Sequence, residues 1–144
     1  MTIASILRSK GSEVVSVRPT QTLGEVAHTL VRHRIGAVLV REDAGTPPIG
    51  ILSERDIVRV FAAEDGLTDG ITAAEAMTRI LHTVTPETPI IQALEMMTDR
   101  RVRHLPVLRD GQLVGMVSIG DLVKARIEAA VSEAEALRDY VSTG

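Results

Sequence analysis

Two stretches of the chain decide its fold: residues 34–56 read RIGAVLVREDAGTPPIGILSERD, and residues 101–121 read RVRHLPVLRDGQLVGMVSIGD. Each contains an apolar run, a turn rich in Gly, Pro or Asp, a second apolar run, and then the pattern Gly-x-x-Ser-x-x-Asp. Two apolar runs joined by such a turn predict a β-hairpin. A Ser with an acidic residue three positions later predicts the start of a helix. The chain is therefore predicted to contain an internal repeat.

The repeat continues upstream in the same order. Val17-Arg18-Pro19 aligns with Val84-Thr85-Pro86, and each element ends a short β-like segment, residues 14–17 and residues 81–84. Farther upstream, Ile6-Leu7 aligns with Ala76-Met77 after a gap of different length. Sparse matches that stay in order over so long a stretch indicate two copies of one structural unit.

A helix is expected between each Val-x-Pro element and the hairpin that follows it. In the first copy, Thr22 and Glu25 predict a capping box. In the second copy, Thr88 precedes Pro89, which would occupy the favoured first helical position. Apolar residues then recur at helical spacing in both copies. Each copy is therefore predicted to be a β-α-β-β-α unit, and the fold class is α/β (α+β).

The segments outside the copies are a linker and a C-terminal helix. Residues 62–72 read AAEDGLTDGIT, with two Gly and three acidic residues, which is typical of a linker. After Asp121 the helical pattern continues. The expected organisation is a first repeat at 3–61, a linker at 62–71, a second repeat at 72–127 and a helical extension at 128–144.

The C-terminal helix carries apolar residues at a spacing of 4-3-4-3-4, which is typical of a coiled-coil seam. The seam residues are Val123, Ile127, Ala130, Ala134, Leu137 and Val141. The small alanines suit close approach of a second helix. The sequence predicts pairing with another helix, either in the same subunit or in a partner; the alternative is a helix that only packs on its own domain.

Composition excludes several classes of function. The chain has 44% hydrophobic residues but only Phe61 and Tyr140 as aromatics, so a nucleobase cannot be bound on a platform of several stacking rings. The absence of Cys excludes disulfides, thiolate metal sites and a cysteine nucleophile. A net charge of -3 argues against broad nucleic-acid binding. No apolar run has the length of a membrane span, and no secretory signal is evident, so a cytoplasmic protein is expected.

The two copies of β-α-β-β-α, with Val-x-Pro before the first helix and Gly-x-x-Ser-x-x-Asp before the last, resemble a tandem pair of CBS domains, also called a Bateman module. RVRHLPVLRDGQLVGMVSIGDL in the second copy is close to the family pattern. The first copy departs from it where residues 36–39, GAVL, replace the usual basic-apolar-Pro stretch. No enzyme domain accompanies the copies, so the chain resembles the stand-alone CBS-pair proteins of bacteria.

The resemblance implies that the copies pack through their strands about a pseudo-two-fold axis, with two clefts between them. Such clefts typically bind adenosyl ligands: AMP, ADP, ATP, NAD(H) or S-adenosylmethionine. Two modules of this family often form a homodimer. The ligand is expected to regulate an unknown protein partner, with neither nucleic acid nor membrane involved.

The Ser-x-x-Asp elements are the first candidate binding residues. Ser53 and Ser118 each follow a strand and begin a helix, where free backbone N–H groups and the helix dipole favour a phosphate. Asp56 and Asp121, one helical turn on, are placed to accept ribose hydroxyls, as acidic residues do in dinucleotide sites. The alternative is that both elements are helix caps without a ligand. Their occurrence in both copies favours the ligand, although an inherited cap would look the same.

Basic residues are the second candidates. Arg103 and His104 directly precede a buried strand, and the resemblance implies that this position reaches ligand phosphates. The alternative, for them and for residues 32–34, is that cations complement a helix C-terminus. Arg55 is expected to face phosphate beside Ser53, whereas Gly120 stands in its place in the second copy, so the two sites should differ in phosphate preference.

The remaining candidates lie on the strands. By resemblance, Ser16 and Thr83 meet the ligand near the ribose and base; the alternative is that they are ordinary strand residues. Adenine would be held by backbone groups and aliphatic side chains of four residues: Ala37, Val38, Leu105 and Pro106. Lys10-Gly11 is expected to be a solvated loop.

No catalytic set is visible. The chain has no Gly-x-Ser-x-Gly element and no phosphate-binding loop of the Gly-Lys-Ser/Thr type. His28 and His33 are five residues apart, which does not place them on one helical face for a metal. The sequence therefore predicts a regulatory nucleotide-binding module that is not an enzyme. The alternative is a ligand-independent dimeric scaffold for protein interaction.

Overall fold

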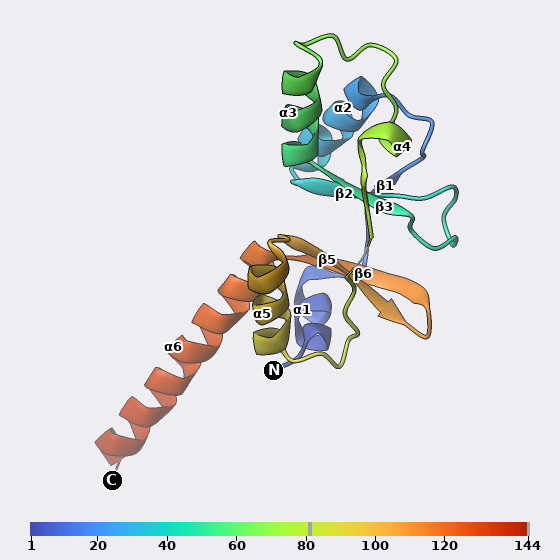
Figure 1. Ribbon diagram of the computed structural model, residues 1–144. Coiled ribbons are helices and arrows are strands. Elements are labelled where there is room, and N and C mark those ends of the chain that lie inside the picture. The colour runs from blue at the N-terminus through green and yellow to red at the C-terminus, as the bar shows by residue number, and fades with distance from the viewer. Residues whose placement is uncertain (81, 144) are drawn as a thin grey trace. The chain divides into compact units, whose positions relative to one another are not determined.

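The computed structural model describes residues 1–80 and 82–143, and Figure 1 shows its helices and strands. The elements in chain order are α1 (Ile3–Lys10), β1 (Ser16–Val17), α2 (Leu23–His33), β2 (Ala37–Val40), β3 (Gly50–Ser53), α3 (Glu54–Ala63), α4 (Ala73–Ala76), β4 (Thr78–Arg79), α5 (Ile90–Arg100), β5 (His104–Arg109), β6 (Gln112–Ser118) and α6 (Ile119–Thr143). This mixed α/β architecture with a long C-terminal helix confirms the predicted fold class.

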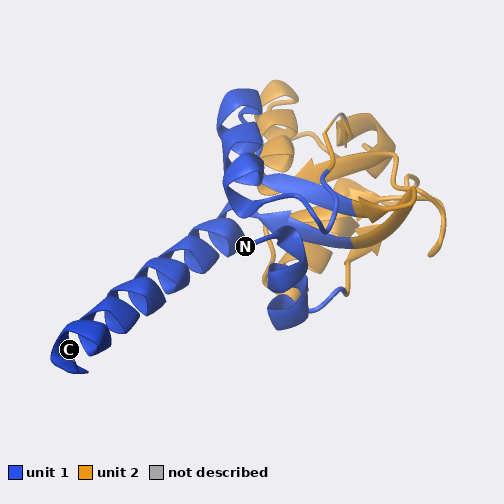
Figure 2. Ribbon diagram, turned by 90° about the horizontal axis from the view of Figure 1, so that it is seen from below, with its two compact units in different colours: residues 1–12, 84–107, 115–144 blue, residues 13–83, 108–114 orange. Residues whose placement is uncertain are grey.

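The chain forms two compact units, coloured separately in Figure 2. Among the described residues, unit 1 comprises 1–12, 84–107 and 115–143, and unit 2 comprises 13–80, 82–83 and 108–114. The compact units therefore do not follow the order of the two repeats along the chain. The predicted repeat boundaries mark the two similar segments of the sequence, not the compact units, and these boundaries stay a prediction.

Each unit takes its leading helix from the other repeat. Helix α1, at the start of the first repeat, belongs to unit 1, where Ala4 N–H donates to the carbonyl of Pro86 (2.8 Å). Helix α4, at the start of the second repeat, belongs to unit 2, where Ala74 N–H donates to the carbonyl of Pro19 (3.0 Å). The two prolines are the aligned residues of the Val-x-Pro elements. Each element thus receives the first turn of a helix from the opposite repeat.

Two glycines allow these leading helices to approach the strands. A Cβ at Gly50, in β3, would overlap the side chain of Met77, which follows α4. A Cβ at Gly115, in β6, would lie 2.6 Å from Cδ2 of Leu7 in α1. Both glycines come from the Gly-x-x-Ser-x-x-Asp pattern, and Leu7 and Met77 are themselves aligned residues. The glycine of the pattern is therefore a packing requirement that both copies share.

Unit 2 contains a four-stranded sheet in the order β1-β2-β3-β4, with β1 parallel to β2 and the other pairs antiparallel. Strand β1 is shorter than the β-like segment expected at residues 14–17. Strand β4 was not predicted, because its two exposed residues have no apolar alternation. The buried core is aliphatic: Val17, Leu23, Val26, Leu30, Val38, Val40, Leu52, Ala73 and Ala76.

Unit 1 contains residues 104–107 of β5 and 115–118 of β6 with helices α1, α5 and α6, while the tip of the β5-β6 hairpin, residues 108–114, belongs to unit 2. Val84 pairs in parallel with Val107 and donates its N–H to the carbonyl of Pro106 (3.0 Å). Leu81, the first residue of the β-like segment expected at 81–84, lies outside the described residues. Pro89 was predicted at the first helical position, but it is the N-cap of α5, which begins one residue later at Ile90. Because Pro89 has no N–H to donate, it is compatible with either position.

Helix α3 extends into the segment that was predicted to be the linker. Helix α3 ends at Ala63, so residues 62 and 63 of the predicted linker are helical. Gly66 and Gly70 then have positive φ angles of 82° and 84°, which the sequence signal for turns anticipated. Thr22 is the N-cap of α2 as expected, and its Oγ1 accepts from Glu25 N–H (3.2 Å). The predicted capping box is only half formed, because the Glu25 carboxylate accepts from the Thr22 hydroxyl (3.2 Å) and not from the Thr22 backbone N–H.

Candidate functional site

The first Ser-x-x-Asp element is a complete capping box at the start of α3. Ser53 Oγ accepts from Asp56 N–H (3.2 Å), while Asp56 Oδ2 accepts from Ser53 N–H (2.9 Å) and from the Ser53 hydroxyl (3.1 Å). These reciprocal bonds satisfy donors that a helix N-terminus otherwise leaves unpaired. The helix-cap alternative is therefore an observed feature of the first copy.

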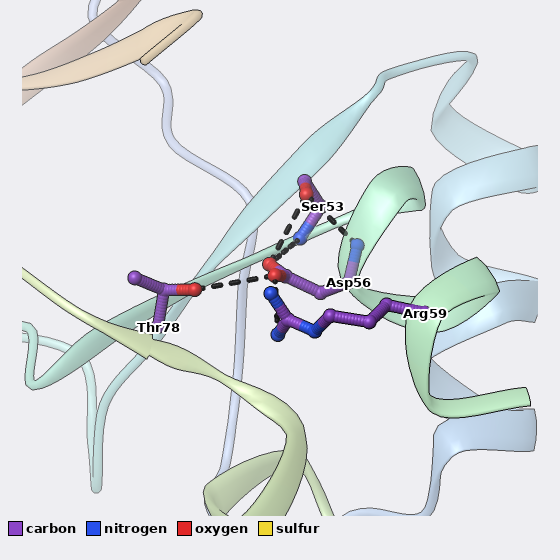
Figure 3. A network of polar contacts seen from close by, with 4 residues as sticks. All are labelled: Ser53, Asp56, Arg59 and Thr78. Carbon is purple, nitrogen blue, oxygen red and sulfur yellow. Dashed lines mark hydrogen bonds and ion pairs between the residues drawn. The ribbon is translucent and has the colours of Figure 1, made fainter. Parts of the chain in front are cut away.

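The second carboxylate oxygen of Asp56 is also occupied (Figure 3). Oδ1 accepts from Arg59 Nη2 (2.9 Å), one turn along α3, and from Thr78 Oγ1 (3.2 Å) in β4. The Asp56 residue is only 5% exposed. Sequence reasoning missed both partners; the i,i+3 spacing of Asp56 and Arg59 was an available signal, whereas Thr78 had none. Each Asp56 oxygen thus accepts two hydrogen bonds from the protein.

The second Ser-x-x-Asp element, at the junction of β6 and α6, has a different set of partners. Asp121 Oδ2 accepts from Ser118 N–H (2.8 Å) and from Lys10 Nζ (2.6 Å), and Ser118 Oγ accepts from Asp121 N–H (3.2 Å). Lys10 Nζ also donates to the Met116 carbonyl (2.9 Å). The expectation that Lys10 lies in a solvated loop is wrong, because Lys10 is the last residue of α1 and its ammonium is held at the start of α6.

The two aspartates therefore differ in accessibility. The Asp56 side chain is 8% exposed, and the Asp121 side chain is 25% exposed. Lys10 Nζ and Ser118 N–H both donate to Oδ2 of Asp121, whereas the donors to Asp56 are divided between its two oxygens. Aligned residues of two similar sequences thus have unequal capacity to accept a hydrogen bond from a ligand.

Lys10 and the helix start hold Asp121 ionised. Partial burial by itself raises the pKa of the Asp121 carboxyl. This effect is outweighed by the hydrogen bond from Lys10, the Ser118 N–H, the positive charge of Lys10 and the Ser118 hydroxyl. The net result is a pKa below the ordinary value of 3.8. The carboxylate is consequently available as an acceptor at any physiological pH.

We expect the Lys10→Met variant to be less stable than the wild-type chain near neutral pH, and this difference to disappear in acid. A carboxyl whose folded-state pKa is lowered stabilises the fold above its unfolded-state pKa, here 3.8, and loses that contribution as pH falls through the lower folded-state pKa. The difference in melting temperature between wild type and Lys10→Met should therefore be constant near neutral pH and shrink below pH 3.8. Melting curves followed by circular dichroism measure it. A difference that grows in acid would contradict the ion-pair assignment.

Ser16 lies in an open polar cleft of unit 2. Its hydroxyl accepts from Arg41 Nε (3.1 Å), and the cleft has a volume of about 280 Å³. The lining residues are Ser16, Val17, Arg18, Gln21, Arg41, Glu42, Asp43 and Ala44. Neither Ser53 nor Asp56 lines this cleft. Arg41 was not among the predicted residues, since nothing in its local sequence distinguishes it from other surface cations.

The residues expected to hold adenine are buried on strands. Ala37 and Val38, 1% and 0% exposed, pair with Ser53 and Leu52 of β3. Leu105 is buried in β5, and the adjacent Pro106 carbonyl already accepts from Val84. The contribution of these residues to ligand binding stays a prediction.

The remaining predicted residues lie at element ends. Thr83 and Arg103 are exposed, His104 is partly buried at the start of β5, and Arg55 is exposed on the first turn of α3. The Arg103 carbonyl accepts from Ile119 N–H (2.8 Å), which ties it to the start of α6. The role of these four residues at a ligand phosphate stays a prediction.

The other basic residues occupy helix C-termini. Arg34 and Arg101, which align in the two copies, are the C-caps of α2 and α5 and have left-handed φ angles of 54° and 55°. Arg32, His33 and Arg100 lie in the last turns of the same helices. Cations there complement the negative end of the helix dipole, as the alternative interpretation of the sequence held.

Within residues 1–80 and 82–143, no group of three or more His, Asp or Glu side chains is arranged to hold a metal ion. Over the same described residues, no helix combines the length and apolar character needed to cross a membrane.

Comparisons with known proteins agree with this architecture. The CBS-domain family model matches residues 4–63 and 73–128. The chain is 32% identical, over 99% of its length and 73% of the relative's, to the "CBS domain-containing protein CBSX3, mitochondrial" of Arabidopsis thaliana. The crystal structure of the CBS-domain protein ATU1752 from Agrobacterium tumefaciens superimposes with a TM-score of 0.83 at 39% identity, over 88% of this chain and 99% of that one.

A further solved structure contains a nucleotide. The CBS domain protein PAE2072 from Pyrobaculum aerophilum, complexed with AMP, has a TM-score of 0.73 and 31% identity over 84% of this chain and 89% of that one. Because the family model matches both repeats, and the fold agrees with solved CBS-domain structures, this chain belongs to the CBS-domain family and contains a tandem pair of CBS domains.

Proposed function

We propose that this chain is a regulatory module that binds an adenine nucleotide, AMP, ADP, ATP or NAD(H), and signals its presence to a protein partner. Family membership and the AMP complex of PAE2072 support nucleotide binding. The observation that carries the proposal is the partly exposed, ionised Asp121 carboxylate at the start of α6. A homodimer and a cytoplasmic location remain predictions from the sequence.

The start of α6 has the chemistry that a nucleoside phosphate needs. Free N–H groups and the positive end of the dipole at a helix N-terminus favour phosphate oxygens. An ionised Asp one turn along accepts ribose hydroxyls. Lys10 Nζ and Ser118 N–H both donate to Oδ2, which leaves Oδ1 the more accessible oxygen of Asp121. Ser118 holds the carboxylate in place through Oδ2.

The start of α3 is less suited to the same task. Asp56 uses both oxygens on protein donors and is nearly buried. A ribose at Asp56 would have to displace Arg59 or Thr78, and the displaced group would lose a hydrogen bond. We therefore propose that Asp121, in the second copy, is the stronger ribose acceptor of the two.

Lys10 provides a mechanism for the signal. Its ammonium occupies Asp121 Oδ2 and links the end of α1 to the start of α6. A second ribose hydroxyl that binds Oδ2, beside the one that Oδ1 accepts, competes with this link, so ligand binding favours a state in which the end of α1 is released. The ligand can shift that equilibrium only by its difference in affinity for the two states.

Isothermal titration of the full chain with AMP, ADP, ATP and NADH tests the proposal directly. Saturable binding by at least one of these ligands, with a rise in melting temperature, is expected. If none binds at millimolar concentration, the chain is instead a ligand-independent scaffold, whose melting temperature nucleotides leave unchanged.

The Lys10→Met variant tests the competition. Removing the ammonium frees Asp121 Oδ2, and because a partly exposed ion pair contributes ~0.2–1 kcal/mol, AMP should bind about 1.4- to fivefold more tightly. Arg8→Met is the matched control, since Arg8 lies in the same last turn of α1 but is not part of the ion pair with Asp121. Weaker AMP binding by Lys10→Met would mean that Lys10 contacts the nucleotide and does not compete with it.

A further inference from the structure

Helix α6 presents an apolar face that its own chain does not cover. Leu122 is the only residue of the helix, Ile119–Thr143, that is buried. Figures 1 and 2 show the rest of α6 extending away from α1 and α5, the other helices of unit 1. Its apolar side chains are largely exposed: Val123 44%, Ile127 58%, Val131 50%, Leu137 65% and Val141 71%. Pairing of the seam within the same subunit, one of the two options left by the sequence, is therefore not observed among the described residues.

The exposed side chains form one continuous seam. The 4-3-4-3-4 spacing places Val123, Ala130 and Leu137 at the d positions of a heptad, and Ile127, Ala134 and Val141 at its a positions. Val131 lies at the edge of the same face. A seam of this kind is the surface by which one helix packs against another in a coiled coil.

We propose that α6 pairs in parallel with α6 of a second copy of this chain. In a parallel coiled coil, the g residue of one helix faces the e residue of the next heptad in its partner. Here Glu133 is a g residue and Arg138 is the corresponding e residue. Glu133 of each copy therefore faces Arg138 of the partner subunit, which gives two attractive pairs by symmetry.

The antiparallel arrangement is opposed by the same charges. When the seam residues are aligned antiparallel, g residues face g residues and e residues face e residues. Glu133 then faces Glu133 of the partner subunit, and Lys124 faces Arg138 of the partner subunit. Both contacts join like charges, which disfavour that pairing. The charges beside the seam thus select the parallel orientation.

A membrane surface fits this helix less well than a second copy. Helices that bind anionic membrane surfaces are rich in Lys and Arg on their polar face. The acidic residues of α6 outnumber the basic ones: Asp121, Glu128, Glu133, Glu135 and Asp139, against Lys124, Arg126 and Arg138. The acidic excess repels anionic lipid, whereas the matched Glu133 and Arg138 favour self-association.

Reversing one charge tests both the pairing and its direction. Sedimentation velocity of the full chain should show a dimer whose dissociation constant rises at least about fivefold in Arg138→Glu, because Glu133 then faces a like charge. The double variant Glu133→Arg/Arg138→Glu should restore the wild-type constant. If Arg138→Glu instead tightens the dimer, the introduced carboxylate has met Lys124 of the partner subunit and the pairing is antiparallel, which overturns the proposal.

A cysteine placed on the seam provides an independent test, because the chain has no native Cys. In the parallel pair, Leu137 lies opposite Leu137 of the partner subunit, so Leu137→Cys should form a cross-linked dimer on mild oxidation. The matched control is Ala136→Cys, one residue away and off the seam, which should remain uncross-linked. A wild-type chain that stays monomeric, or a Leu137→Cys variant that dimerises without cross-linking, overturns the proposal.

Ile127→Glu distinguishes this face from any other dimer interface. The variant places a charge in the seam at a position that is 58% exposed in the single chain, so the fold itself should be unaffected. Dimerisation should be lost while the melting temperature measured at high dilution stays that of wild type. A dimer that persists in Ile127→Glu would place the interface on another surface and overturn the proposal.

Discussion

The Asp121→Ala variant is expected to bind AMP at least about tenfold more weakly than the wild-type chain. A hydrogen bond to a charged group contributes ~1.5–3 kcal/mol net, and ~1.4 kcal/mol corresponds to a factor of ten in affinity. Asp121 is the ionised, partly exposed carboxylate at the start of α6, and alanine removes the group that would accept the ribose hydroxyls. Isothermal titration calorimetry with AMP measures the change.

Asp139→Ala is the matched control for this effect. Asp139 is an exposed acidic residue on the same helix, so its replacement changes the net charge equally without touching the start of α6. AMP affinity should be that of wild type. If Asp121→Ala binds AMP normally while Asp56→Ala does not, the nucleotide is held by the first copy, and the proposed preference for the second copy is wrong.

The Asp56→Ala variant is expected to affect mainly stability, lowering the free energy of unfolding by about 1–3 kcal/mol. Loss of a helix cap costs ~0.5–2 kcal/mol, and partners left unpaired add to the cost. Asp56 caps α3 through Ser53 and also binds Arg59 and Thr78. Urea denaturation followed by circular dichroism measures the loss.

The matched control for the stability effect is Asp69→Ala. Asp69 is an exposed acidic residue between α3 and α4, and its replacement should change stability by less than ~0.5 kcal/mol. The loss of unfolding free energy in Asp121→Ala should lie between those of Asp56→Ala and Asp69→Ala, because the Asp121 carboxylate is more exposed than that of Asp56. Equal losses in Asp56→Ala and Asp69→Ala would show that the buried network around Asp56 contributes little to the fold.

Much of the candidate site was predictable because its signals are local. Ser53 and Ser118 begin helices as expected, since the bonds between each serine and the aspartate three residues later form within one turn. The choice between cap and ligand was not predictable. It depends on how many donors already surround each aspartate, and those donors include Thr78 and Lys10, which are distant in the sequence.

The sequence showed that the two repeats share a glycine, but not why glycine is needed there. Gly50 and Gly115 aligned in the sequence, but the reason for glycine at these positions became visible only with Met77 and Leu7 packed against them. The alignment of Ile6-Leu7 with Ala76-Met77 likewise did not predict the helices α1 and α4 found there, nor which unit each one joins. An amphipathic helix has the same apolar face wherever it packs.

By itself, the sequence determined the two copies, the helix that follows each Val-x-Pro element, the hairpin and last helix of each copy, and the apolar seam of α6, but not α1, α4 or β4. These features depend on backbone preferences and on contacts within a few residues, which the order of amino acids encodes directly. The tertiary structure alone decided that α1 and α4 pack in the unit of the opposite repeat and that Lys10 reaches Asp121. It also decided that the Asp56 side chain is buried while the Asp121 side chain remains partly exposed. Those outcomes depend on long-range packing, because identical local motifs acquire different partners when different segments of the chain fold against them.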